Sequence, residues 1–398
     1  MNRRLFLATS FGGAIAAAQQ TEVPASIRAL KPMTDGIQPI GEDERKARIE
    51  KARRLMSDNK LGAILCEGGS TLFYYTGVRN TGGLWILPAK SEPVWVVPAS
   101  EGDRVHGDVR AYAASEEPYA KAAQALKGVA RLGVEERTRF AVFDALRKET
   151  PSMQFASADP VTVGCRVIKS PAEIALMQRA NDITIAAYKA ALPTMREGMT
   201  NRDLSANIGA AYRALGVNGG AMAIFGKYTA FPHGSVQPQA LREGDMVLID
   251  DGCSVDGYQS DITRTTVFGK PTARQRQIWD LERKAQDAAL AAARVGAPCE
   301  AVDAAARKVI TDAGFGPGYK VPGLPHRTGH GIGLDGHEWT NLVKGNKTPL
   351  RPGMCFSDEP TIAIYGEFGV RLEDCFYMTE SGGRMFTKQS PSIEQPFG

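Results

Sequence analysis

The chain has 398 residues, a hydrophobic content of 43%, a charged content of 23% and a formal net charge of +4. This length is enough for two domains, and the composition is typical of a globular protein rather than a disordered or fibrous one. The small net charge, with no basic cluster interleaved with aromatic residues, argues against nucleic-acid binding and against binding to a membrane surface.

The first 18 residues have the layout of an export signal. Paired arginines at positions 3 and 4 precede a weakly apolar run that ends at Ala16-Ala17-Ala18, a small-residue cleavage site. The paired arginines are typical of the twin-arginine type, and the run is too short and too polar to span a membrane. The sequence therefore predicts a twin-arginine-type signal at 1–18, a linker at 19–41 and a periplasmic protein; without a working signal the protein would be cytoplasmic.

Residues 42–165 alternate between predicted helices and strands. An amphipathic helix is predicted at 42–58, a strand at 61–66 and a second segment at 71–76. The elements predicted after these are hairpin strands at 84–87 and 94–97, a helix at 117–127, a strand at 132–135 and a helix at 137–148. This alternation predicts a smaller N-terminal domain of the α/β type.

A capping box marks the start of a second domain, predicted at 166–390. Ser170 is the expected N-cap, Pro171 the first helical residue and Glu173 the reciprocal acceptor. Apolar residues then recur at spacings of three and four along a long helix. Further helices are predicted near 200–216, 272–294 and 300–313, with antiparallel hairpins between them. This mixture predicts an α+β fold.

Two of these hairpins bring carboxylates together. Asp250 and Asp261 flank a turn at Asp256-Gly257, and the midpoint between them falls within the hairpin. Glu359 and Glu373 are likewise centred on a glycine. A simple hairpin would set each pair face to face, where like charges are destabilising. We therefore interpret both pairs as ligands for cations.

Histidines add to this pattern. Four of the five lie at His233, His326, His330 and His337, and three of those fall in the Gly-rich stretch 325–338. Two aspartates, two glutamates and one histidine would suit Mn²⁺, Co²⁺, Fe²⁺ or Zn²⁺. Two such ions would balance four carboxylates and could share a bridging hydroxide for hydrolysis. His233 and His337, if they are not ligands, are candidates for proton transfer or for stabilising an oxyanion.

The sequence around these residues resembles the metallopeptidases of the pita-bread fold, family M24, and within it the Xaa-Pro aminopeptidases and Xaa-Pro dipeptidases (prolidases). The resemblance covers 168–385. It rests on Leu-Ile-Asp-Asp-Gly-Cys, Gly-Tyr-Gln-Ser-Asp-Ile-Thr-Arg-Thr, Thr-Gly-His-Gly-Ile-Gly-Leu-Asp-Gly-His-Glu, Asp-Glu-Pro and Gly-Val-Arg-Leu-Glu-Asp. The N-terminal domain is similar, less specifically, to the creatinase/prolidase N-terminal domain.

The resemblance implies a metal-binding role for five residues. Asp250 would bind one ion, while Asp261 and Glu373 would bridge both. His330 and Glu359 would complete the second position, and Glu359 would also take the proton of the bridging water.

The resemblance also implies roles around the substrate. His233 would orient the substrate, and His337 would stabilise the tetrahedral intermediate. His326 and Arg371 would line the pocket that receives proline.

The implied function is a dinuclear metal-dependent exopeptidase that cleaves between an N-terminal residue and proline through a metal-bridging hydroxide. Manganese is the expected metal, a peptide with proline at its second position is the expected substrate, and a homodimer or larger homo-oligomer is the expected assembly. Aminopeptidase and dipeptidase activity are both consistent with the sequence. Other pita-bread chemistry, such as a creatinase-like amidinohydrolase or a metal-dependent lyase, and a non-catalytic binding protein are alternatives that the complete ligand set disfavours.

Overall fold

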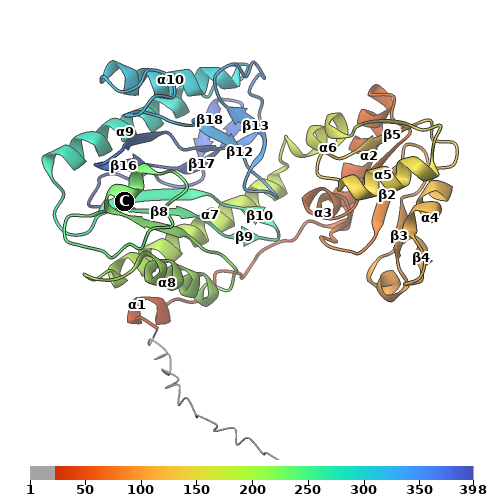
Figure 1. The fold of residues 1–398 in the computed structure, drawn as a ribbon, viewed down its shortest axis with the longest axis horizontal. Coiled ribbons are helices and arrows are strands. Elements are labelled where there is room, and N and C mark those ends of the chain that lie inside the picture. Colours follow the sequence, from red (N-terminus) through yellow and green to blue (C-terminus); the bar gives the residue numbers. More distant parts are fainter. Residues whose placement is uncertain (1–22, 398) are drawn as a thin grey trace, which may run out of the picture.

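A computed structural model describes residues 23–397 and shows two lobes of unequal size (Figure 1). The predicted export signal lies outside the described residues. Residues 23–41, predicted as a linker, start against the larger lobe, where helix α1 (Ala25–Arg28) lies near α8, and then cross to the smaller lobe. Ile27 and Ile40 of this segment are buried, so it packs against the protein along its path. Within residues 23–397 no helix has both the length and the apolar content to cross a membrane.

The smaller lobe is a three-layer α/β unit. Its six-stranded sheet has the order β4-β3-β2-β1-β5-β6, with β1 (Ala63–Cys66), β2 (Leu84–Pro88), β3 (Val94–Pro98), β4 (Asp108–Tyr112), β5 (Arg131–Val134) and β6 (Gln154–Ser157). Buried side chains of α2 (Glu42–Asp58) and α6 (Asp159–Arg166) pack on one face of the sheet. Those of α4 (Pro118–Ala125) and α5 (Phe140–Glu149) pack on the other face.

The second segment of this lobe, at 71–76, is helix α3 (Ser70–Thr76). Thr, Phe and Tyr in this segment are more common in strands, but the left-handed Gly77 ends the helix in the usual way. The structure also contains β4, β6 and α6, which the sequence pattern did not indicate.

The larger lobe places curved sheets between two pairs of helices. The helices α7 (Pro171–Ala191) and α8 (Asn201–Ala214) lie on one side, and α9 (Ala273–Ala292) and α10 (Cys299–Asp312) on the other (Figure 1). The capping box at Ser170 is present, with the Ser170 side chain accepting from the Glu173 amide. The predicted α+β character of this lobe is therefore confirmed.

The described strands of this lobe form four sheets. The first has the order β11-β8-β7, with β7 (Met222–Phe225), β8 (Met246–Asp251) and β11 (Ile262–Val267). The second has the order β13-β12-β14-β17-β18, with β12 (Gly329–Gly331), β13 (Glu338–Leu342), β14 (Cys355–Asp358), β17 (Asp374–Thr379) and β18 (Gly382–Met385). The other two sheets have two strands each: one consists of β15 (Thr361–Ile364) and β16 (Phe368–Arg371), and the other of β9 (Ser254–Val255) and β10 (Tyr258–Gln259).

The register of the Glu359–Glu373 hairpin is the predicted one. Strands β14 and β17 pair Asp358 with Asp374, and β15 and β16 pair Thr361 with Arg371. The residues between these pairs, Glu359 and Glu373, follow the same register and lie opposite each other.

The register of the other hairpin differs from the prediction. Strands β8 and β11 pair Asp250 with Thr263 rather than with Asp261. Asp256 and Gly257 both have positive φ, 46° and 85°, as in the two-residue type I′ turn. This turn centres the hairpin between the two residues and moves Asp250 two positions along the ladder. Asp250 and Asp261 are therefore diagonal neighbours, which is still close enough for both side chains to reach one site.

Candidate metal centre

One cavity of about 290 Å³ brings all the predicted site residues together. It lies between the two hairpins and the loop that precedes and follows β12. The residues that line it are His233, Asp250, Asp251, Asp261, His326, Arg327, His330, His337, Glu359, Arg371 and Glu373. Asp251 and Arg327 are the two members that the sequence did not single out.

The five predicted ligands form two overlapping groups. Ligand atoms of Asp250, Asp261 and Glu373 lie within 4.8 Å of one another, and so do those of His330, Glu359 and Glu373. Glu373 is common to both groups. The five residues thus lie close enough together to act as metal ligands, while the number of ions and the bridging by Asp261 and Glu373 stay predictions. A third group joins Asp261 and His330 with His337, which was not expected to act as a ligand.

The buried carboxylates repel one another. Burial, followed by the charge of Asp250, raises the pKa of Asp261 well above its usual value. Burial and the charge of Asp261 do the same to the pKa of Glu373. Within residues 23–397, Glu373 Oε1 is buried and lacks a hydrogen-bond partner. An unpartnered acceptor among like charges is costly, and divalent cations would remove this cost. The donor set therefore fits the implied metal ions.

His330 is oriented for a role as a ligand. Its Nδ1 lies 3.0 Å from the carbonyl oxygen of Gly331, so this nitrogen carries the proton that it donates. Its Nε2 points to the carboxylates, 3.2 Å from Glu359 Oε1 and 3.7 Å from Asp261 Oδ2. Burial lowers the pKa of His330, but Glu359 and Asp261 outweigh it and raise this pKa. Burial in turn raises the pKa of Glu359, but His330 more than offsets this and lowers it to about 2.

Thr263 orients two of the carboxylates, a role that the sequence analysis did not assign. Its Oγ1 lies 2.8 Å from Asp250 Oδ1 and 2.6 Å from Glu373 Oε2. The sequence alone could have placed Thr263 beside the site, because it lies two residues after Asp261 and alternate residues of a strand share a face.

Arg371 lines the cavity but is held from several sides. Its Nη2 is paired with Asp250, and its Nε donates to Thr263 Oγ1 at 3.0 Å. Its Nη1 donates to the carbonyl of Pro232 at 3.0 Å. The guanidinium thus supports a metal ligand and fixes the loop that carries His233, in addition to any contact with substrate.

The other three histidines that line the cavity lie around this centre. His326 is half-buried, with Nε2 3.0 Å from Thr361 Oγ1, and burial lowers its pKa. His337 is exposed and lies edge-on to His330, with ring centroids 4.1 Å apart. Burial of part of its ring, together with the charge of His330, lowers the pKa of His337 to about 4. Its imidazole is therefore neutral at pH 7. His233 is exposed at the rim of the cavity.

Fold and site together indicate a metal-dependent enzyme, because the acidic and histidine side chains between the two hairpins form groups that could hold a metal ion. Residues 175–380 match Metallopeptidase family M24, and residues 48–168 match the Creatinase/Prolidase N-terminal domain. The chain belongs to metallopeptidase family M24.

Relatives of known structure or name extend over nearly the whole chain. The Xaa-Pro dipeptidase of Lactobacillus helveticus is 34% identical over 368 residues, which cover 87% of this chain and 98% of that protein. The Xaa-Pro dipeptidase of Pyrococcus furiosus is 30% identical over 346 residues, covering 86% and 98%. The crystal structure of a prolidase from Thermococcus sibiricus superposes with a TM-score of 0.81 at 29% identity, covering 87% and 98%. These findings confirm the predicted pairing of an M24 pita-bread domain with a creatinase-type N-terminal domain.

Proposed function

We propose that the protein hydrolyses the bond between an N-terminal residue and proline, with two divalent cations held by Asp250, Asp261, His330, Glu359 and Glu373. Manganese is the metal we expect. The observation that carries this proposal is the pair of overlapping ligand groups that share Glu373. The names of relatives that match along almost their whole length support Xaa-Pro dipeptides as the substrates.

The residues of the site divide the chemistry between them. The two cations, when bound, would lower the pKa of a water molecule and polarise the carbonyl under attack. Glu359 would accept the proton of the attacking water, because its carboxylate belongs to one of the two ligand groups and lines the cavity. His337 is neutral at pH 7 and can donate an N–H to the oxygen on which charge develops. His233, at the rim, orients the substrate.

The size of the cavity favours a short substrate. The cavity volume of about 290 Å³ lies just below the range of roughly 300–1,000 Å³ that is usual for ligand pockets. A dipeptide suits this volume better than a long peptide does. The proline ring would lie beside His326 and Arg371.

The sequence supports three further proposals, which concern the domains, the export and the assembly of the protein. We propose residues 166–390 as the catalytic domain and 42–165 as a separate domain. We also propose export through the signal at 1–18 and assembly into a homodimer or larger homo-oligomer. Cell fractionation of the full chain and its R3K/R4K variant tests the export, and sedimentation of the purified protein tests the assembly.

An assay on matched peptides tests the function. We expect Mn²⁺-dependent hydrolysis of Ala-Pro, slower hydrolysis of Ala-Pro-Ala, and little hydrolysis of Ala-Ala. Faster turnover of the tripeptide would indicate an aminopeptidase. Equal turnover of Ala-Ala, or no turnover of any Xaa-Pro peptide with added Mn²⁺, would contradict the proposal. Creatine, included as a further substrate, tests amidinohydrolase chemistry.

A further inference from the structure

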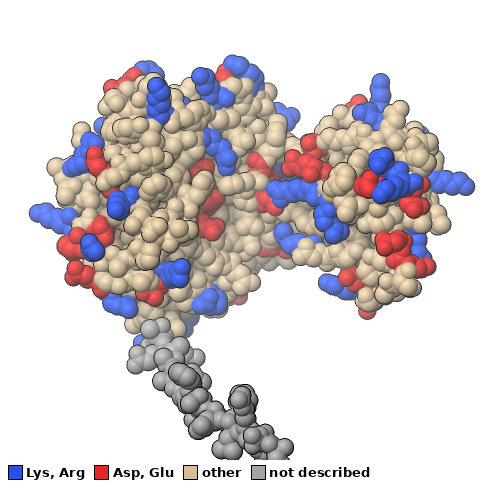
Figure 2. All heavy atoms as spheres, in the orientation of Figure 1, with Lys and Arg blue, Asp and Glu red and all other residues tan. Residues whose placement is uncertain are grey.

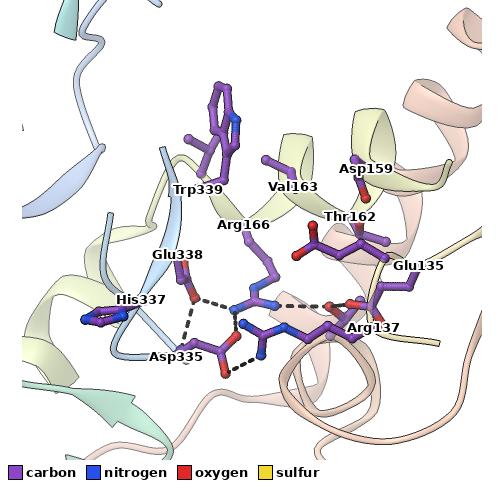
Figure 3. A pocket seen from close by; sticks show the side chains of 13 residues that line it. Glu135, Arg137, Asp159, Thr162, Val163, Arg166, Asp335, His337, Glu338 and Trp339 are labelled. Atoms are coloured by element: carbon purple, nitrogen blue, oxygen red, sulfur yellow. Dashed lines mark hydrogen bonds and ion pairs between the residues drawn. The ribbon is translucent and has the colours of Figure 1, made fainter. Parts of the chain in front are cut away.

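A second polar cluster lies where the two lobes meet, beside the loop that carries His337. It surrounds a small cavity of about 60 Å³. We call it the junction cluster and define it by Ser70, Thr71, Arg137, Arg166, Lys169, Asp335 and Glu338. Figure 3 shows Arg166 near its centre, with Asp335 and Glu338 on one side and residues of the smaller lobe on the other. His337 lies on the far side of Glu338 from the smaller lobe in this view.

Arg166 makes three contacts, and two of them join the smaller lobe to the larger one. It is the last residue of α6, and its side chain is 14% exposed. Its Nη2 donates to Asp335 Oδ2 at 2.7 Å and also contacts Glu338 Oε1. Its Nη1 donates to Thr71 Oγ1 of the smaller lobe at 3.0 Å. One guanidinium therefore fixes both carboxylates of the loop.

Glu338 stabilises the turn of the loop at residues 334–338. Its Oε1 accepts from the backbone amides of Leu334 at 2.9 Å and Asp335 at 3.2 Å, while Oε2 accepts from Lys169 Nζ at 2.9 Å. Burial would raise the pKa of Glu338, but Arg166 and Lys169 lower it to about 2. Glu338 is thus an anion around which residues 334–338 fold, and the residue just before it is His337.

The smaller lobe holds the same loop from its other end. Asp335 Oδ1 accepts from Ser70 Oγ at 2.7 Å and lies 3.4 Å from Arg137 Nη1. His337 lies between Asp335 and Glu338, the first residue of β13, and its ring is edge-on to His330. The orientation of His337 therefore depends on groups that lie outside the metal centre.

We propose that Arg166 is a positioning residue for the reaction, acting through Glu338 and Asp335 to hold His337 against the metal centre. This rests on the proposed function of His337 in stabilising charge on the substrate. The smaller lobe then contributes to turnover by supporting this loop.

Kinetics of single and double variants test the coupling. We expect Arg166→Gln to lower kcat for Ala-Pro by about 10- to 100-fold with little change in KM, because the lost contribution belongs to the transition state. Arg166→Lys should recover part of this loss, because a cation remains but the planar fork does not. In the His337→Ala background, Arg166→Gln should cost less than about twofold, because residues that act as a unit are not additive. Arg139→Gln is the matched control, since Arg139 pairs with Glu67 in the same lobe and lies outside the junction cluster.

A spectroscopic readout tests the positioning without relying on activity. The chain has only five histidines, so imidazole carbon–proton NMR signals of the metal-free protein can be assigned by single substitutions. We expect Arg166→Gln to shift or broaden the signal of His337 while that of His106, in the smaller lobe, is unchanged. Asp335→Asn, which neutralises one half-buried partner of Arg166, should act in the same direction and covers the case in which Arg166→Gln does not fold.

Two results would overturn the proposal. One is a His337 signal that neither Arg166→Gln nor Asp335→Asn alters. The other is a loss from Arg166→Gln that is as large in the His337→Ala background as in the wild type. If the wild-type protein hydrolyses no Xaa-Pro peptide with Mn²⁺, the proposed function fails, and the NMR comparison alone then decides whether Arg166 positions His337.

Discussion

The metal centre and the junction cluster lie on opposite sides of one loop, and the buried carboxylates in them have different partners. In the junction cluster, Glu338 meets Arg166 and Lys169, and its pKa falls to about 2. In the metal centre, Asp261 and Glu373 chiefly meet other carboxylates, and their pKa values rise. Burial is common to both. The comparison teaches that the sign of the pKa shift follows the partner, and that several buried carboxylates gathered around one cavity without enough counter-charge make a candidate cation site.

The largest expected effect comes from neutralising Asp261, which we propose as a bridge between the two cations. Asp261→Asn should abolish binding of the two metal ions. It should also lower turnover of Ala-Pro by about 10³-fold or more, because the cations supply several kcal/mol of transition-state stabilisation. In metal-free protein the same substitution should raise the melting temperature, since it removes a repelled charge. Calorimetry with and without Mn²⁺ checks both effects. A variant that stays active, or that is less stable than the wild type without metal, would show that Asp261 is not such a ligand.

Neutralising the paired acid should have the reverse effect. Glu338→Gln should destabilise the protein by about 3 kcal/mol at pH 7, because a pKa lowered from 4.5 to about 2 reports an interaction of about 1.4 kcal/mol per pH unit. The pKa is lowered, so this stabilisation is complete above about pH 4.5 and is lost as the pH falls towards 2. Urea unfolding at pH 7, 5 and 3 should show the gap between variant and wild type narrowing. A gap of the same size at pH 3 and pH 7 would argue that the charge of Glu338 is not the cause.

The smallest expected effect concerns the support of the ligands. Thr263→Val removes the hydroxyl shared by Asp250 and Glu373 and should weaken Mn²⁺ binding by about 10- to 100-fold. Thr265→Val is the matched control on the same strand face, because Thr265 Oγ1 bonds the backbone of Arg371 instead. Isothermal titration of both variants makes the comparison. Equal Mn²⁺ affinities in the two variants would show that Thr263 does not orient the ligands.

The sequence predicted most of the fold because its signals were local. Ser170 and Glu173 are close in the chain, and the capping box they form could be predicted from spacing alone. Segment 71–76 was harder, since its Thr and Tyr residues favour strands by themselves and become helical by packing in the lobe. The junction of the lobes could not be predicted, because Arg166 and Glu338 are 172 positions apart and no local pattern links them.

The positions of the site residues could be predicted only where the register of the hairpin could be predicted. Glu359 and Glu373 lie opposite each other as expected, because the turn between them is symmetric about a glycine. Asp250 and Asp261 do not, because the Asp-Gly turn centres the ladder one position further on. Asp-Gly is a type I′ signal, so this register could have been derived. Thr263 and the several partners of Arg371 needed the folded structure, since they depend on contacts between strands far apart in the sequence.

Anomalous X-ray diffraction from Mn²⁺-loaded crystals tests the central claim most directly. We expect two anomalous peaks per chain, one among Asp250, Asp261 and Glu373 and the other among His330, Glu359 and Glu373. No peak in this cavity after loading, or peaks only elsewhere on the molecule, would contradict a metal centre built from these five residues.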